Sequence, residues 1–325
     1  MSLLRNVHTM KWFLELSLVL FLPSLVISLP KGFIAQVVTS TPAVSGIFAP
    51  NPRKNGKPML LLIQKEGKVK VLEDPDESPD SEVIFDLSGY MCTETERGLH
   101  SITIHPDFES NLYVYLYYTK FKEGCLTEDL ENGPWNVLTR FTMDIQTLTL
   151  DYDSREEIWR GASTHDAIHN GGGILFGNDG KLYLTTGDSG TQDNAQDLKT
   201  VHGSIIRLNE DGSIPNDNPF LNGFEPYDCV KSEGKVPSNV TADNAVCAEI
   251  FAYGLRNPFR VAVDPSEKEK VCFVISDVGA RVWEELSYAG TDYSGRNYGY
   301  KTFESEMVAA VGRSPQRFLQ INFFA

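Results

Sequence analysis

Short apolar or alternating runs follow one another along most of the chain. The clearest is Leu112–Tyr118, LYVYLYY, because aromatic residues strongly favour strands. No long stretch repeats apolar residues at i, i+3 and i+4, so few helices are expected. The other predicted strands are Met59–Gln64, Lys68–Leu72, Ile174–Phe176, Leu182–Thr186, Ser204–Leu208, Arg260–Val263 and Val271–Ile275.

One pattern recurs three times: a short apolar strand, a turn containing Asp, and a second strand ending in small or polar residues. The three units are Ile102–Thr119, Ile174–Asp188 and Val261–Asp277. Such recurrence is typical of an all-β sandwich, barrel or propeller. The anchors Ile104, Phe176 and Val263 are 72 and 87 residues apart. These spacings are close to two propeller blades of about 40–50 residues each.

The first 28 residues form a separate segment. Arg5 and Lys11 precede the apolar run Trp12–Ile27, and this arrangement predicts a secretory signal peptide over residues 1–28. The alternative is a membrane anchor, but the run is short and contains Glu15. No later stretch is apolar enough to span a bilayer. We therefore expect a secreted, extracellular protein.

The chain is acidic, with 44 Asp and Glu against 29 Lys and Arg and a formal net charge of −15. Removing the signal peptide changes the charge to −16. Because an acidic protein repels phosphate backbones, nucleic acid is excluded as a partner. Calcium, neutral sugars and basic proteins remain compatible partners.

The five cysteines contain no CxxC pair, so a zinc site is not indicated. In an exported chain the economical arrangement is two disulfides, Cys92–Cys125 and Cys229–Cys247, although sequence does not establish connectivity. Cys272 lies in the strand-like run VCFVIS and is expected to be a buried thiol.

Long polar loops such as Glu210–Cys247 are expected to be insertions on a binding face. This loop contains the sequon Asn239-Val240-Thr241, so Asn239 is a predicted glycosylation site.

The segment His169–Asp188, HNGGGILFGNDGKLYLTTGD, carries the strongest candidate chemistry. An imidazole such as His169 transfers protons near neutral pH, and Asp188 could orient it from the end of a neighbouring strand. The glycines Gly171–Gly173 would let the backbone approach a ligand closely. The alternative is a hairpin with a glycine-rich lead-in and no chemistry.

Several motifs, taken together and in order, resemble the glucose/sorbosone dehydrogenase family, which includes soluble quinoprotein glucose dehydrogenases and aldose sugar dehydrogenases. The signal peptide, paired cysteines and HNGG sequence look closest to the animal Hedgehog-interacting-protein-like branch. The matching segments are Arg97–Phe108, His169–Asp188, Asn194–Leu208, Gly212–Phe220, Tyr253–Pro265 and Val278–Tyr300.

The resemblance implies a six-bladed β-propeller of the quinoprotein glucose dehydrogenase type over residues 29–312. Residues 313–325 do not resemble the family, so the final blades are expected to be missing, as in a truncated gene product or a splice form. Two further departures are His100, where the family usually has an aliphatic residue, and Tyr300, where it usually has tryptophan.

The resemblance also implies roles for residues at the mouth of the central channel, where the family holds pyrroloquinoline quinone. His169, oriented by Asp188, would take the proton of the anomeric hydroxyl while hydride passes to the quinone. Arg256 and Asn257 would face the quinone, and Glu96 would contact the substrate.

A calcium site is implied as well. Glu285 and the backbone of Tyr298, with Gly279 nearby, match calcium-holding positions. Glu284 and Asp292 are competing ligands, and a solvated acidic loop is the alternative.

The expected function is that of a secreted oxidoreductase acting on the CH–OH group of an aldose with a quinone acceptor. The alternative function is that of a cofactor-free extracellular binding module with a protein ligand. A third hypothesis is a non-functional fragment.

Overall fold

The computed structural model describes residues 37–54, 56–121, 125, 134–164, 166–232, 235–280 and 284–301. The predicted signal peptide over residues 1–28 and the tail over residues 313–325 lie outside these ranges. No helix in the described ranges is long and apolar enough to cross a membrane.

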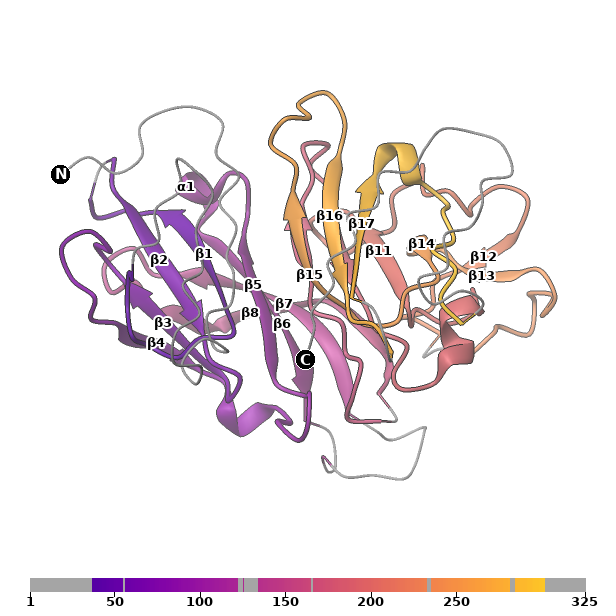
Figure 1. Ribbon diagram of the computed structural model, residues 1–325, viewed down its shortest axis with the longest axis horizontal. Coiled ribbons are helices and arrows are strands. Elements are labelled where there is room, and N and C mark those ends of the chain that lie inside the picture. The colour runs from indigo at the N-terminus through magenta and orange to yellow at the C-terminus, as the bar shows by residue number, and fades with distance from the viewer. Residues whose placement is uncertain are drawn as a thin grey trace, which may run out of the picture.

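Four antiparallel sheets follow one another from indigo to yellow in Figure 1 and form four blades of an all-β propeller. The described residues thus contain four blades, and the predicted six are not confirmed. Blade 1 contains β1 (Ser45–Pro50), β2 (Pro58–Ile63), β3 (Lys68–Leu72) and β4 (Glu82–Asp86). Blade 2 contains β5 (Leu99–Ile104), β6 (Tyr113–Lys120), β7 (Trp135–Met143) and β8 (Leu150–Ser163). Blade 3 contains β9 (Ile174–Phe176), β10 (Leu182–Thr185), β11 (Ser204–Leu208) and β14 (Ile250–Tyr253), and blade 4 contains β15 (Pro258–Val263), β16 (Cys272–Asp277) and β17 (Glu285–Gly290).

Smaller elements connect the blades. A parallel pair, β12 and β13, is part of the insertion between β11 and β14. Helix α1 is a single turn. The bounds of these elements are β12 (Glu225–Tyr227), β13 (Ala245–Cys247), α1 (Phe108–Asn111), η2 (Ser88–Tyr90), η3 (Gln192–Gln196) and η4 (Thr291–Tyr293).

The first strand of each blade lies closest to the propeller axis. β1 contacts β5, β5 contacts β9, and β9 contacts β15, so these four inner strands surround a common centre. The three recurring sequence units are the two innermost strands of blades 2, 3 and 4. Spacings of 72 and 87 residues therefore each represent one blade, and the two-blade interpretation was wrong. The blades are longer than expected because β8 has 14 residues and an insertion separates β11 from β14.

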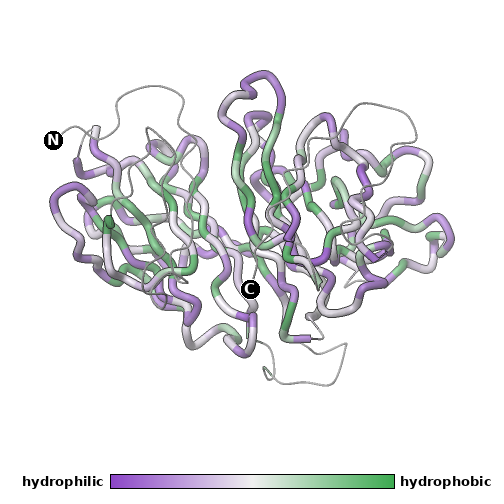
Figure 2. Tube along the Cα trace, in the orientation of Figure 1, coloured by the Kyte–Doolittle hydropathy of each residue, from purple (hydrophilic) through white to green (hydrophobic). Residues whose placement is uncertain are grey.

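The core lies between adjacent blades, and β6 shows how the sequence builds it. Successive side chains of a strand point to opposite faces. Val114 and Leu116 therefore pack in the cluster shared with blade 1, whereas Tyr115 and Tyr117 pack in the cluster shared with blade 3. A strand buried on both faces needs a continuous apolar run, which is what the sequence has. Hydrophobic positions concentrate on the strands and hydrophilic ones on the loops (Figure 2).

Both predicted disulfides are present. Cys92 and Cys125 have Cα atoms 5.4 Å apart, and Cys229 and Cys247 have theirs 5.2 Å apart. Cys272 is free but only half-buried, so its predicted burial was wrong. Its neighbour Phe273 faces the core, and alternation places Cys272 on the opposite face of blade 4.

The predicted glycosylation site lies in the loop that Cys229–Cys247 closes. Asn239 is exposed in a turn of this loop, which is compatible with a glycan. Glycosylation of Asn239 stays a prediction.

Glu249 is a buried carboxyl group beside the Cys229–Cys247 disulfide. Its Oε1 accepts a hydrogen bond from the backbone N–H of Val230 at 3.1 Å, and its Oε2 is buried with no partner in the described chain. Burial raises the pKa of Glu249 to about 7 from 4.5. The folded protein therefore binds a proton more tightly than the unfolded chain does.

This shift predicts that the free energy of unfolding falls as pH rises from 4.5 through 7, by at most about 3 kcal/mol. Glu249→Gln should make the fall in stability with pH smaller, because the amide is neutral at every pH. Urea denaturation between pH 5 and 8 measures the effect, with the exposed Glu269→Gln as control. Parallel pH profiles for wild type and Glu249→Gln would contradict the assignment.

Candidate functional site

Residues that precede three inner strands meet at one end of the axis, which we call the mouth. Glu96 precedes β5, His169 precedes β9 and Asn257 precedes β15. The backbone N–H of His169 donates to Glu96 Oε2 at 2.7 Å, and Asn257 Nδ2 donates to the same oxygen at 3.4 Å. The N–H of Gly171 donates to Asn257 Oδ1 at 3.0 Å. Blades 2, 3 and 4 thus contribute to one constellation.

His169 and Asp188 form a hydrogen-bonded pair at the mouth. His169 Nδ1 lies 2.5 Å from Asp188 Oδ1, and the side chains are 10% and 0% exposed. The two are adjacent because β9 and β10 are antiparallel, so the end of β10 lies beside the start of β9. Asp188 Oδ1 accepts a hydrogen bond from Nδ1–H, which leaves Nε2 as the hydrogen-bond acceptor of the ring. The structure gives this nitrogen no partner among the described residues.

The backbone of His169 has φ +55°, in the left-handed region that few residues other than glycine adopt. Such a conformation persists only where the surroundings hold it, and it occurs often at functional sites.

The three glycines after Asn170 lie where a side chain would collide with the protein's own chain. A Cβ on Gly171 would lie 2.4 Å from Thr185 O, one on Gly172 2.9 Å from Phe259 O, and one on Gly173 2.6 Å from Val261 Cγ1. The backbones of Gly172 and Gly173 also line a central cavity, so close approach of a ligand to these glycines stays a prediction. They let the lead-in to β9 pack against β10 and β15.

Asp277 was missed by the sequence reasoning. It ends β16 and accepts hydrogen bonds from the N–H of Arg256 at 3.0 Å and of Asn257 at 2.6 Å. Burial raises the pKa of Asp277 to about 7. The signal was present, because Asp188 and Asp277 end corresponding units of the recurring pattern. Asp188 holds the segment that precedes β9, and Asp277 holds the segment that precedes β15.

Arg256 is a cation at the mouth. Its Nη1 donates to Val278 O at 2.9 Å, and its Nε is buried without a partner in the described chain. The carboxyl groups of Glu96, Asp188 and Asp277 surround the same loops. Lys65 and Arg97, the cations beside Glu96, donate to the backbone carbonyls of Thr95 and Thr164. Three carboxyl groups therefore lie around Arg256.

The predicted calcium residues are only partly brought together. Glu284 Oε2 accepts the N–H of Gly279 at 3.2 Å, and Glu285 begins β17 opposite Asp277. Asp292 lies beyond the other end of β17, paired with Lys270 at 2.9 Å, so it is remote from Glu285.

The backbone N–H of Tyr298 donates to Tyr253 O at 2.8 Å. Within the described ranges, groups of three or more His, Cys, Asp or Glu side chains close enough to bind one metal ion occur only around the two disulfides. A calcium site at Glu285, Tyr298 and Gly279 stays a prediction.

If this site exists, calcium should raise the melting temperature of the purified protein by on the order of 5 °C at 100 times its dissociation constant. Glu285→Ala should abolish the rise, and Asp292→Ala serves as control because it lies beyond the far end of β17. Differential scanning calorimetry with calcium and with chelator measures the shift. Identical curves for wild type in the two conditions would refute the site.

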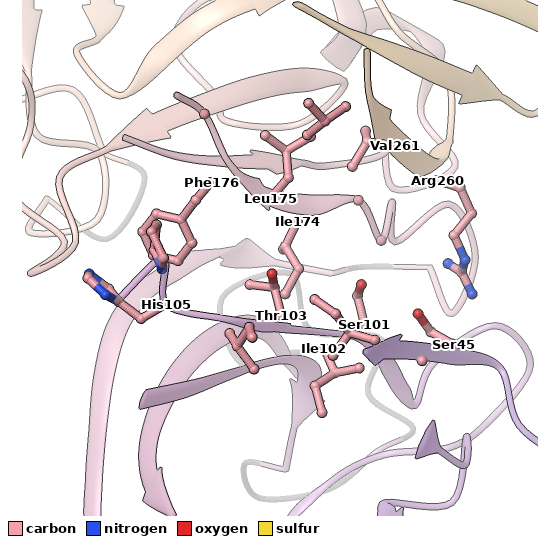
Figure 3. Close-up of a pocket in the computed structure, with 18 of the residues that line it drawn as sticks. Ser45, Ser101, Ile102, Thr103, His105, Ile174, Leu175, Phe176, Arg260 and Val261 are labelled. Carbon is pink, nitrogen blue, oxygen red and sulfur yellow. The ribbon is translucent and has the colours of Figure 1, made fainter. Parts of the chain in front are cut away.

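A cavity of about 590 Å³ follows the axis below the mouth. Ser101 and Thr103 of β5 direct their hydroxyls into it, and Ile174 reaches in from β9 (Figure 3). Arg260 lies near one end and His105 near the other. The volume is in the range of small-molecule sites.

The model of the family described as glucose/sorbosone dehydrogenase matches residues 52–227. Quinoprotein glucose dehydrogenase B of Acinetobacter calcoaceticus is 28% identical, with 79% of this chain and 51% of that protein covered. Hedgehog-interacting protein of Homo sapiens is 30% identical, with 65% of this chain and 29% of that protein covered. This chain thus spans about half the length of the first relative and less of the second.

Among solved structures, the PQQ-bound form of aldose sugar dehydrogenase from Streptomyces coelicolor superposes with a TM-score of 0.65 at 24% identity, covering 89% of this chain and 71% of that one. This likeness concerns the fold. The family model covers more than half of the chain. It includes β2–β4 of blade 1, all of blade 2, the His169–Asp188 pair and Glu96. The chain therefore belongs to the glucose/sorbosone dehydrogenase family.

Proposed function

We propose that this chain is a secreted sugar dehydrogenase-like protein that binds an aldose at the mouth and takes the proton of its hydroxyl with His169. The observation that carries the proposal is the 2.5 Å contact between His169 Nδ1 and the fully buried Asp188. The relatives named as sugar dehydrogenases support the substrate class. The predicted signal peptide and the two disulfides support secretion.

The proton transfer follows from the pair's geometry. Asp188 holds the ring in the tautomer with Nδ1 protonated, so the lone pair of Nε2 accepts the proton of the sugar hydroxyl. The imidazolium that forms is stabilised by the carboxylate of Asp188. Glu96 is exposed at the mouth, and one of its oxygens is engaged with His169 and Asn257. Its other oxygen is suited to accept a second hydroxyl of the sugar.

Oxidation also requires a hydride acceptor, which in the quinoprotein relatives is pyrroloquinoline quinone. A quinone that carries several carboxylates needs several cations. At the mouth, Arg256 lies among the carboxyl groups of Glu96, Asp188 and Asp277, and its Nη1 is engaged with Val278 O. The described residues therefore do not fit this cofactor by themselves, and we derive no step through it.

Binding of an aldose is testable without turnover. Titration with glucose should shift the NMR ring signals of His169, identified by their absence in His169→Gln. The signals of His105 are an internal control, because this residue follows β5 at the far end of the cavity and pairs with Glu210. Unchanged His169 signals at high glucose concentration would overturn the proposal.

The second candidate is a cofactor-free extracellular binding module. It is favoured by the acidic mouth and by similarity to a protein named for interacting with Hedgehog. Under this alternative the mouth binds a protein ligand, and glucose leaves His169 unaffected.

A further inference from the structure

A chain of hydrogen bonds between buried side chains runs through blade 2 behind the His169–Asn170 segment. His100 Nε2 lies 3.0 Å from Thr119 Oγ1, and Thr119 Oγ1 donates to Asn136 Oδ1 at 2.7 Å. Asn136 Nδ2 then donates to Asn170 Oδ1 at 3.1 Å. All four side chains are at most 5% exposed. The chain crosses β5, β6 and β7 and ends in the residue next to His169.

The direction of these bonds follows from the donors available. A hydroxyl has one hydrogen, and that of Thr119 goes to Asn136, so Thr119 Oγ1 accepts from His100 Nε2–H. Complete burial lowers the pKa of His100 to about 3, so its ring is neutral. The amide of Asn136 is thereby held with its oxygen toward Thr119 and its nitrogen toward Asn170.

The backbone around His169 is held on both sides. Its own N–H donates to Glu96, and the carbonyl of Asn170 accepts the hydroxyl of Tyr117 at 2.9 Å and Asn136 Nδ2 at 3.4 Å. These contacts stabilise the left-handed conformation of His169, which is otherwise unfavourable.

The ends of the recurring units support the same interpretation. Asp188 ends the unit of blade 3 and holds His169, and Asp277 ends the unit of blade 4 and holds Arg256 and Asn257. Thr119 ends the corresponding unit of blade 2. Thr119 holds the His169–Asn170 segment through Asn136, and its side chain is a neutral hydroxyl where Asp188 and Asp277 have a carboxyl group.

We propose that His100, Thr119 and Asn136 are positioning residues that act through Asn170 to orient His169 and the direction of its Nε2. The inference deepens the proposed function, on which it rests in taking His169 as the proton acceptor. The relay is neutral throughout, so it orients the ring without competing with Asp188 for the proton on Nδ1.

The test uses Thr119→Val in the full chain, with NMR of the His169 ring nitrogens in the absence of sugar. The matched control is Thr139→Val, because Thr139 is also a buried strand threonine, with its hydroxyl donating to Tyr118 at 3.3 Å and not to the relay. Thr119→Ser restores the hydroxyl. Both valine variants lose a buried hydrogen bond, so a general loss of stability affects both.

We expect one sharp set of His169 signals in wild type, Thr119→Ser and Thr139→Val. In Thr119→Val we expect doubled or broadened signals, because Asn136 can then flip and release Asn170. Sharp wild-type signals in Thr119→Val, or equal broadening in Thr139→Val, would overturn the relay. If Thr119→Val does not fold, the test uses His100→Leu, which removes the hydrogen-bond donor to Thr119. Broadened His169 signals in this variant support the relay, and unchanged signals overturn it.

These signals are recorded without turnover or ligand. Failure of glucose to bind to wild type therefore overturns the proposed function alone, whereas the relay is judged by the variants.

Discussion

The 325-residue chain is expected to bind added pyrroloquinoline quinone weakly, with a dissociation constant of about 1 mM or more, and to show little or no dye-linked glucose oxidation. Arg256 lies among the carboxyl groups of Glu96, Asp188 and Asp277, and the whole chain carries a net charge of −15. Asp277 is only partly ionised near neutral pH, because burial raises its pKa to about 7. Like unit charges ~4 Å apart near a protein surface repel by about 4 kcal/mol. Absorbance titration with quinone, with calcium present, measures the affinity.

A matched pair of variants separates charge from other causes. Glu96→Gln removes one of the opposing charges and should tighten quinone binding, whereas Glu269→Gln removes an exposed charge outside the mouth and should not. Submicromolar quinone affinity or robust turnover by wild type would show that the described residues suffice. In that case His169→Ala should lower kcat by about 10²–10⁴-fold, as expected for loss of a general base. Turnover that survived His169→Ala would identify a different base.

Gly187→Ala is expected to lower the free energy of unfolding by about 1–3 kcal/mol and to displace His169. A Cβ on Gly187 would lie 2.1 Å from the carbonyl oxygen of His169 and 3.1 Å from Asn257 Oδ1. Backbone cannot yield as a flexible side chain can. The loop that carries Asp188 must therefore separate from the one that carries His169. Thermal denaturation measures the loss, and the NMR ring signals of His169 report the displacement.

The control for this prediction is Gly89→Ala. Gly89 lies in η2 without a positive φ, and a Cβ added to it would meet no heavy atom within 4 Å, so an added methyl group is accommodated. The free energy of unfolding of Gly89→Ala should lie within about 0.5 kcal/mol of the wild-type value. Equal melting temperatures for the two variants would mean that the close packing of Gly187 has no role in holding the pair.

Strand positions were predictable because the signal for them is local. The predicted runs Lys68–Leu72, Ile174–Phe176 and Ser204–Leu208 coincide with β3, β9 and β11, since alternating or apolar runs with β-favouring residues need no tertiary information. β8 was missed. Its first half is exposed and rich in charged residues, so it resembles a polar loop, and only pairing with β7 makes it a strand.

Blade assignment needed the structure for a different reason. The recurring units identified the inner hairpins, but their spacing was misinterpreted because nothing local distinguishes a long outer strand or an insertion from another blade. The glycines after Asn170 illustrate the same limit. A glycine signals a close approach, and only the packing of β9 against β10 and β15 shows that the approaching group is the protein's own chain.

Local pattern and motif resemblance sufficed to select His169 and Asp188, which are 19 residues apart on one hairpin-like unit. The meeting of Glu96, His169 and Asn257 depended on the tertiary fold, because their contacts join residues 73 to 161 positions apart in sequence. The same holds for the last link of the relay, from Asn136 to Asn170, which joins blade 2 to the lead-in of blade 3. Hydrogen bonds between blades depend on how sheets pack around the axis, and that geometry arises only when side chains from all the blades fill the space between them.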